Sequence, residues 1–445
     1  MGTKAALLCF LVGLAAPSVS AQGQIGGHVL TDWRARLDDG KVLWNENRLE
    51  LEIDASPTSK AHLFAQFWIR GFGVSEAATT QDLMGLDKRK SNPWDLLPRE
   101  AYVDLYGFFT PDLDLRIGRQ RIAWGTADKI NPTDNLNPDD LEDIWDFGRH
   151  LGTSSVLAQY YRGDVTISAV FTPGFTPATL PPADWAAALS TPLALPGGVE
   201  AGKLSDELDM PVNTLRETAS VAVKIARPVL NYDLSLSYLT GRSDFPVPIR
   251  VVLTPVDSNS VDVHSTLVYP RMSVLGADLS GAIRTVGVWA EIAVFFPEAV
   301  YTTLDMSALE LGQQEIVSLP DEHFARYVVG GDYTFAGGLY INAQFIHGFA
   351  HELGRDCLHN YVVAGLEKKL RNDTIQITVA GAVEIPDSAH PGDNYAIIGM
   401  PEIAYYPSDN SEITCGVRVI GEKGQTSFGQ LAEMDEGYIV FRYAF

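Results

Sequence analysis

The sequence predicts an all-β chain that closes into an antiparallel transmembrane β-barrel of about 18 strands, with roughly 16 and 20 as bounds. Three observations predict this fold. Apolar and polar residues alternate along many segments. Most of these segments run for about 9–13 residues, the length of a tilted strand that crosses a bilayer. The connections between them are alternately short and long. A soluble antiparallel sheet shares only the alternation.

The alternating segments are the expected strands. In chain order they lie near 25–37, 46–56, 61–72, 99–109, 112–124, 154–162, 164–172, 215–227, 231–241, 266–277, 281–296, 325–335, 338–348, 360–370, 374–384, 395–405, 411–420 and 437–445. In the last of them, Ile439, Phe441 and Phe445 share one face. An apolar, aromatic face that ends in a terminal Phe is typical of the strand that closes an outer-membrane barrel.

The connections predict the orientation of the barrel. Short connections lie at 56–59, 110–111, 163, 228–230, 279–280, 336–337, 372–373 and 408–409, and long ones at 73–98, 125–153, 173–214, 242–265 and 297–324. Outer-membrane barrels have short periplasmic turns and long extracellular loops. We therefore expect both termini on the periplasmic side of a Gram-negative outer membrane, with lipid and lipopolysaccharide around the wall. The sheet must close on itself, because backbone polar groups in hydrocarbon need partners within the protein.

Residues 1–21 are expected to be a cleaved signal peptide, and residues 22–445 a single barrel domain. Lys4 precedes an apolar run at 5–16, and Val19-Ser20-Ala21 forms a small-residue cleavage site. Beyond this segment the sequence has no apolar run of about 18 residues that could form a spanning helix.

The composition excludes several classes of partner. The net charge of −23 argues against nucleic acid, which calls for basic patches. The sequence has no C-x-x-C-H haem motif, and we expect no cofactor. Cys357 and Cys415 are not expected to pair, because their strands are not neighbours. Cys415 falls with apolar residues and should face lipid.

Charged residues follow the polar face of the first five expected strands, which should face the pore. The expected pore-lining residues are Arg34, Arg36, Arg48, Glu50, Glu52, Arg70, Asp104, Arg116, Arg119 and Arg121. Two interpretations stay open. In one, the charges pair across neighbouring strands and merely keep the interior wet. In the other, they form a charged wall that orients and selects solutes.

The stretch G-R-Q-R-I-A-W-G, residues 118–125, is the most specific motif. It resembles the strand-to-loop motif of Gram-negative porin-like barrels, notably the alginate-export-type family and related uncharacterised porin families. The resemblance implies an outer-membrane channel without naming a solute. Strict alternation would place Arg119 and Arg121 toward lipid, where a central arginine costs about 2–4 kcal/mol. We therefore expect a bulge or strand end near Gly118 that turns both arginines inward.

The acidic loop 125–153 follows this motif. Its acids include Asp128, Asp134, Asp139 and Asp140. One interpretation makes the loop an external cap with solvated charges. The other folds it into the barrel as a constriction, where acids facing arginines across a narrow pore would create a transverse field that sorts polar solutes. The spacing of a calcium loop, D-x-[DN]-x-[DN]-G, is absent.

Metal binding and catalysis have little support in the sequence. His347, His351 and His359 have the ligand type of a zinc or copper site, but we interpret them as interfacial and solvated, and expect no metal. The motifs G-x-S-x-G and H-E-x-x-H are absent, so we do not expect an enzyme.

The sequence therefore predicts an outer-membrane channel, a porin, through which small hydrophilic or charged solutes diffuse. The first alternative is a sheath for a partner such as a multihaem cytochrome in an electron conduit. The second is a barrel enzyme. A homotrimer is also open, because an apolar subunit interface and a lipid-facing wall have the same sequence pattern.

Overall fold

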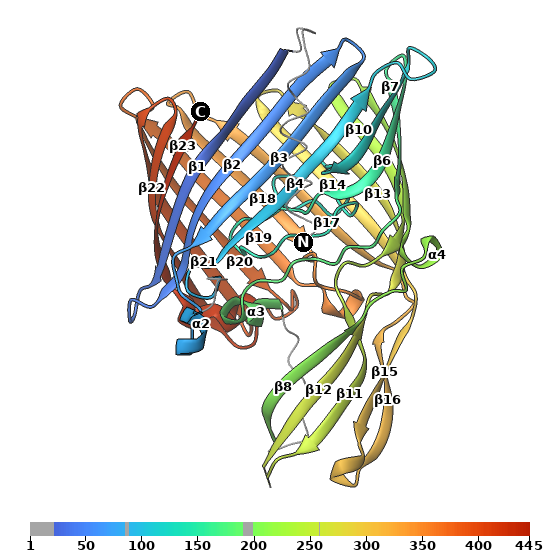
Figure 1. The fold of residues 1–445 in the computed structure, drawn as a ribbon, viewed down its shortest axis with the longest axis vertical. Coiled ribbons are helices and arrows are strands. Elements are labelled where there is room, and N and C mark those ends of the chain that lie inside the picture. The colour runs from blue at the N-terminus through green and yellow to red at the C-terminus, as the bar shows by residue number, and fades with distance from the viewer. Residues whose placement is uncertain (1–21, 85–88, 190–198, 258) are drawn as a thin grey trace.

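A closed β-barrel forms the body of the molecule (Figure 1). The structure is a computed structural model that describes residues 22–84, 89–189, 199–257 and 259–445, so the expected signal peptide lies outside the described residues. Eighteen strands form one sheet in which each strand pairs antiparallel with the next. Pairing of the last strand with the first closes the sheet, with Phe441 opposite Thr31. The predicted fold class is confirmed.

The wall follows chain order. Its strands are β1 (Gln22–Arg36), β2 (Val42–Thr58), β3 (Ala61–Phe72), β4 (Trp94–Leu105), β5 (Leu113–Gln120), β6 (Thr153–Arg162), β7 (Val165–Thr172), β9 (Ser220–Val229), β10 (Tyr232–Arg242), β13 (Arg271–Ile283), β14 (Val286–Pro297), β17 (Phe324–Thr334), β18 (Leu339–His347), β19 (Asn360–Leu370), β20 (Ile375–Ile385), β21 (Tyr395–Ser408), β22 (Ser411–Lys423) and β23 (Glu436–Ala444). Several strand boundaries differ from the sequence prediction: β4 ends at Leu105, β5 ends at Gln120, and residues 266–268 belong to β12 of a second sheet. The β13–β14 turn lies at 284–285 rather than 279–280, and residues 215–218 form a short helix before β9.

The two faces of the wall differ as the alternation predicts. Along β23, Ile439 and Phe441 point outward and are 40% and 41% exposed, whereas Glu436 and Tyr438 are buried on the inner face. The apolar outer face can meet hydrocarbon, because the ladder hydrogen bonds satisfy the backbone within the sheet.

Except for 37–41 between β1 and β2, the short connections lie at one end of the barrel, here called the turn end. They span 59–60, 106–112, 163–164, 230–231, 284–285, 335–338, 371–374 and 409–410. The other connections, at the loop end, include 73–93, 121–152, 173–219, 243–270, 298–323, 348–359 and 424–435. The C-terminus lies at the turn end (Figure 1).

A second sheet projects from the loop end (Figure 1). Its strands are β8 (Glu200–Asp209), β11 (Val247–Pro255), β12 (Ser260–Val268), β15 (Val300–Met306) and β16 (Gly312–Leu319), in the order β16-β15-β11-β12-β8. Val251, Leu253, Val261 and Val263 form its apolar core. These segments come from three separate connections, which the sequence predicts as long loops. Their strands pair in parallel between loops, β12 with β8 and β11 with β15, which no local pattern reveals.

Helices are short and confined to the connections. They are α2 (Thr80–Met84), α3 (Ala183–Ala186), α4 (Leu215–Thr218) and the 3-10 turns η1 (Ala187–Leu189), η2 (Ser307–Leu309), η3 (Arg355–Cys357) and η4 (Phe428–Met434). Within the described ranges, no helix combines the length and apolarity needed to span a membrane.

The main apolar cluster lies inside the barrel toward the loop end. Trp145 of loop 125–153, Phe349 of loop 348–359 and Phe428 of η4 pack there with inward-facing wall residues such as Ile398 and Tyr361. Three connections thus fold back into the barrel and bury their aromatic side chains together. Each fully buried aromatic or aliphatic side chain contributes about 1.5–3 kcal/mol.

Candidate functional site

Arginines line the inner face of β1–β4. We call Arg34, Arg48, Arg70 and Arg99, with the indole of Trp68 among them, the arginine wall. Arg34, Arg70 and Arg99 are all less than 10% exposed. The guanidinium carbons of Arg48 and Arg99 lie 4.1 and 4.2 Å from the Trp68 ring centroid. Such cation–π contacts gather like charges that would otherwise repel one another.

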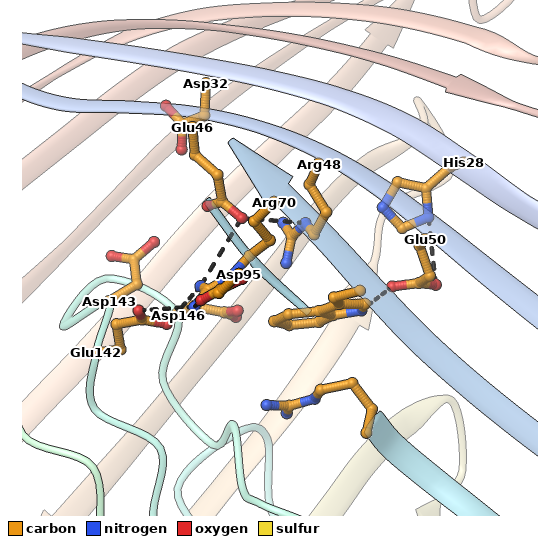
Figure 2. Close-up of polar contacts among 12 residues, drawn as sticks. His28, Asp32, Glu46, Arg48, Glu50, Arg70, Asp95, Glu142, Asp143 and Asp146 are labelled. Carbon is orange, nitrogen blue, oxygen red and sulfur yellow. Dashed lines mark hydrogen bonds and ion pairs between the residues drawn. The ribbon is translucent and has the colours of Figure 1, made fainter. Parts of the chain in front are cut away.

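Loop 125–153 docks directly on this wall. Asp143 accepts from Arg34 at 2.8 Å, Glu142 from Arg70 at 2.6 Å, and Asp140 from Arg99 at 2.7 Å. Figure 2 shows Asp95 and Glu142 gathered at the Arg70 guanidinium. These distances leave no room for a solute between the acids and the arginines.

Other charges of the first strands pair locally. Within the strands, Arg116 donates to Asp104 at 2.7 Å and lies 4.0 Å from the Tyr102 ring centroid. The ring nitrogen of His28 lies 3.3 Å from Glu50, which also accepts the Trp68 indole N–H.

The remaining expected pore-lining residues pair in the same way. Arg48 lies 3.5 Å from Glu46, and Glu52 accepts from Gln66 at 3.0 Å. Arg36 is at the rim, where it pairs with Asp38 and Asp39 of the β1–β2 connection.

The motif at 118–125 positions the start of the loop. Arg121 turns inward beyond the end of β5 and donates to Asp134 at 3.0 Å, while Trp124 is 6% exposed. Gly125 has φ +100°, a conformation that favours glycine. A Cβ there would meet the Glu291 carboxylate at 2.8 Å. Glu291 of β14 accepts the backbone N–H of Thr126 and Ala127. The loop therefore crosses the barrel interior from β5 to β14.

Arg119 corrects the expectation for this motif. It stays on the outer face of β5 with Leu115 and Ile117, and its Nε donates to the Pro98 carbonyl at 2.8 Å. The register of β5 continues unbroken through Gly118. The irregularity lies instead in β4, where Gln66 faces Glu100 and Phe67 faces Pro98. Because of this shift, Arg99 lies between Pro98 and Glu100 without a partner in β3, and its side chain is on the inner face of the barrel wall.

The loop acids divide between three sets of partners. Asp134 accepts from Arg121 and Asp140 from Arg99, in direct contact rather than across a pore. Asp128 instead accepts from Asn342 of β18 at 2.9 Å. Asp139 lies beside Asp244 of loop 243–270, whose carboxylate accepts the Asp139 backbone N–H at 2.8 Å. The acids that neutralise Arg34 and Arg70 are Asp143 and Glu142, which the sequence shows as loop acids without indicating their partners.

The carboxyl groups of Asp143 and Asp139 in this loop have pKa shifts in opposite directions. Burial opposes ionisation of Asp143, but the Arg34 guanidinium outweighs burial and holds the Asp143 pKa below its usual range. Burial raises the pKa of Asp139, and the neighbouring Asp244 and Asp134 carboxylates raise it further. Burial also raises the pKa of Asp244. The loop therefore contacts buried arginines on one side and the buried carboxyl group of Asp244 on the other.

Another part of the wall, separated from β1 by β22 and β23, is apolar. We call the inward-facing Val363, Ala380, Ala382, Ile398 and Met400 of β19–β21 the apolar wall. A cavity of about 340 Å³ separates it from loop 125–153, whose Ile130, Trp145 and Phe147 line the other side. This cavity lies beside the aromatic residues of the loop, whereas Asp140, Glu142 and Asp143 contact the arginine wall.

The cavity has a polar border toward the turn end. Strand register places Tyr340, Glu367, Thr378 and Glu402 in one row across β18–β21. Tyr438 of β23 reaches the same row and donates to Glu402 at 2.6 Å.

The histidines are more enclosed than the sequence analysis expected. His359 lies 2.8 Å from the Glu384 carboxylate, and His347 lies 2.9 Å from the Asn360 side-chain oxygen. Burial lowers the pKa of His351 to about 4. Among the described residues, no group of three or more His, Cys, Asp or Glu is arranged to hold a metal ion.

Solved structures share this fold at very low sequence identity. OccAB1 of Acinetobacter baumannii superposes with a TM-score of 0.51 at 8% identity, covering 96% of each chain. OccK9 (OpdG) of Pseudomonas aeruginosa superposes with a TM-score of 0.50 at 9% identity, covering 96% of this chain and 98% of that one. No protein-family model matches the chain, and no curated protein sequence matches it.

These likenesses agree with the fold class already described, a closed 18-stranded antiparallel β-barrel. At such identities they extend to the fold alone. The finer resemblance to alginate-export-type barrels is not confirmed and stays a prediction.

Proposed function

We propose that the protein is a Gram-negative outer-membrane channel for small solutes, with the turn end and both termini in the periplasm. The path runs between loop 125–153 and the apolar wall, and the loop is the constriction. The observation that carries this proposal is the 340 Å³ cavity between them. The acids and arginines expected to face each other across a charged slot are instead in contact.

This path changes the expected mechanism of selection. A transverse field needs opposite charges separated by water, and contact pairs buried at a loop–wall interface supply little of it. In the proposed channel, the arginine wall holds the loop in place. The loop then fixes the width of the path, and the opposite wall determines which solutes pass.

The test is to narrow the proposed path at one residue. Ala380 faces the cavity, while Val379 on the same strand faces outward and is 51% exposed. We expect Ala380→Trp to lower the single-channel conductance in planar bilayers severalfold, because an indole would occupy the cavity. The matched Val379→Trp variant should conduct like the unaltered protein.

Two results would contradict the proposal. One is the absence of any single-channel current from correctly folded, unaltered protein. The other is an equal conductance for both tryptophan variants, which would place the path elsewhere. No feature of the described residues favours the two alternatives, a cytochrome sheath or a barrel enzyme.

A further inference from the structure

We propose that the cavity beside loop 125–153 selects organic cations with an apolar body, such as an ammonium group on a ring or short hydrocarbon chain. This inference rests on the proposed function and specifies its substrate class. It follows from three features of the cavity: an acidic row at one side, an apolar surface at the other, and small residues between them.

The acidic row is built by strand register. Glu367 of β19 faces Thr378 of β20, which in turn faces Glu402 of β21. Neighbouring strands lie about 4.8 Å apart, so the two glutamates stand roughly 10 Å apart on either side of Thr378. A cationic head group entering between them can approach both carboxylates while the Thr378 side chain lies beneath it.

These carboxylates have no cationic partner. Among the described residues, neither Glu367 nor Glu402 lies within ion-pair distance of a lysine, arginine or histidine, and Glu402 accepts one hydrogen bond, from Tyr438. Arg418 also lines the cavity, on the neighbouring strand β22, where it lies over the Tyr438 ring and is neutralised by Glu436. Asp128 and Lys129 of the loop carry opposite charges. The uncompensated charge of the lining is therefore negative, and rings of acidic side chains favour cations in pores.

The other side of the cavity is apolar and partly aromatic. Val363, Ala382, Ile398, Trp145 and Phe147 line it. A fully hydrated ion loses solvation against such a surface, whereas a ring or alkyl chain gains from contact with it.

Small residues leave the space that such a body needs. Gly365 and Ala380 face one another across β19 and β20, between the acidic row and the apolar residues. Apolar cavities of this size, with a few placed polar groups, are typical of small-molecule sites. The lining therefore orients a solute with its charge toward the turn end and its body toward the loop end.

The test is calorimetric titration of the folded, unaltered protein in detergent micelles with four probes. 2-Phenylethylammonium carries both features, ethylammonium lacks the ring, phenylacetate reverses the charge, and 2-phenylethanol reports partition of the ring alone. We expect 2-phenylethylammonium to bind about tenfold more tightly than each of the other three. Equal binding of 2-phenylethylammonium and phenylacetate would overturn the charge assignment. Equal binding of ethylammonium would overturn the requirement for an apolar body.

Glutamine variants locate the site. Glu367→Gln and Glu402→Gln should each weaken 2-phenylethylammonium binding severalfold and leave 2-phenylethanol unaffected. The control is Glu412→Gln, which removes a carboxylate from the inner face of β22 outside the cavity. A channel that conducts in bilayers but fails these titrations leaves the proposed function standing and overturns the inference. A protein that binds the cation but carries no current overturns the proposed function and leaves the cation-binding site standing.

Discussion

The arginine wall and the apolar wall belong to the same barrel and differ in how their charges are used. The arginine wall has many charges, and contact pairs with loop acids neutralise Arg34, Arg70 and Arg99. The strands that carry the apolar wall have few charges toward the cavity. The two carboxylates of the neighbouring acidic row, Glu367 and Glu402, have no cationic partner among the described residues. The number of charges on a surface is therefore a poor guide to its selectivity, because a paired charge mainly provides attachment.

The largest expected effect comes from removing the acids that attach the loop. In a triple variant Asp140→Asn, Glu142→Gln and Asp143→Asn, the buried arginines lose their partners, and each broken buried pair costs about 3–5 kcal/mol. We expect the loop to leave the wall, the conductance to rise severalfold and the ion preference to shift toward anions. Single-channel recording in a KCl gradient measures both quantities.

The control for this variant is Asp146→Asn. Asp146 is half exposed and lies 3.6 Å from Arg149, so its loss should leave conductance and ion preference nearly unchanged. If the triple variant keeps the unaltered ion preference, the arginines do not face the path even when their partners are removed, and the comparison of the two walls fails.

A smaller effect is expected at the centre of the arginine wall. Trp68→Leu removes the ring between Arg48 and Arg99 and also the indole donor to Glu50. We expect a loss of about 2–4 kcal/mol in stability, since a large buried aromatic is truncated and its cation–π contacts disappear. Trp68→Phe keeps a ring and should lose less. Thermal unfolding followed by circular dichroism separates the two, and equal losses would assign the effect to the hydrogen bond alone.

The stability contributed by the connection 348–359, which ends at His359, should depend on pH. Burial lowers the pKa of His359, but the Glu384 carboxylate, with Glu352 nearby, outweighs burial and raises it above the usual 6.5. A raised histidine pKa contributes stability that is fully present below pH 6.5 and is lost as pH rises through the folded value. We expect His359→Gln to unfold at a lower temperature than the unaltered protein at pH 5.5, with the difference shrinking by pH 8. A difference that grows with pH would contradict the ion pair.

The smallest expected effect is a gain in stability, from a substitution at Asp244. Burial raises the pKa of Asp244 above 3.8, and the adjacent Asp139 shifts in the same direction. A carboxyl with a raised folded pKa loses stability as pH rises from 3.8 through that value. Asp244→Asn still accepts the Asp139 N–H and cannot ionise. We therefore expect it to match the unaltered protein near pH 4 and to exceed it slightly in unfolding temperature at pH 7. A variant less stable at pH 7 would show that the charge of Asp244 is needed.

The sequence predicted the wall well and the site only in part. Alternation in segments such as 437–445 determines which residues face outward, since the side-chain period of a strand is fixed. Charged residues such as Arg34 and Arg70 could be placed on the inner face for the same reason. Their partners could not be assigned, because Asp143 and Glu142 lie in a loop with no periodicity. Arg119 was misplaced, since the irregularity that reorients side chains lies in β4 rather than at Gly118.

The five-stranded sheet and the acidic row are two further features that could not be predicted from any single segment of the sequence. The sheet joins strands from separate loops, so no single segment of sequence carries its pattern. Glu367 and Glu402 are visible as acids on polar faces, but their common level depends on the register of three strands. A shift of one residue in either pairing would separate them.

The sequence alone determined that this chain forms a closed antiparallel barrel with charged residues inside, because strand periodicity and connection length are local properties. Only the tertiary structure decided where the interior is open. It placed the acids of loop 125–153 in contact with the arginine wall and its aromatic residues across a cavity from the apolar wall. The physical reason is that ion pairing and cavity shape depend on the path of a loop through three dimensions, which no periodic pattern encodes.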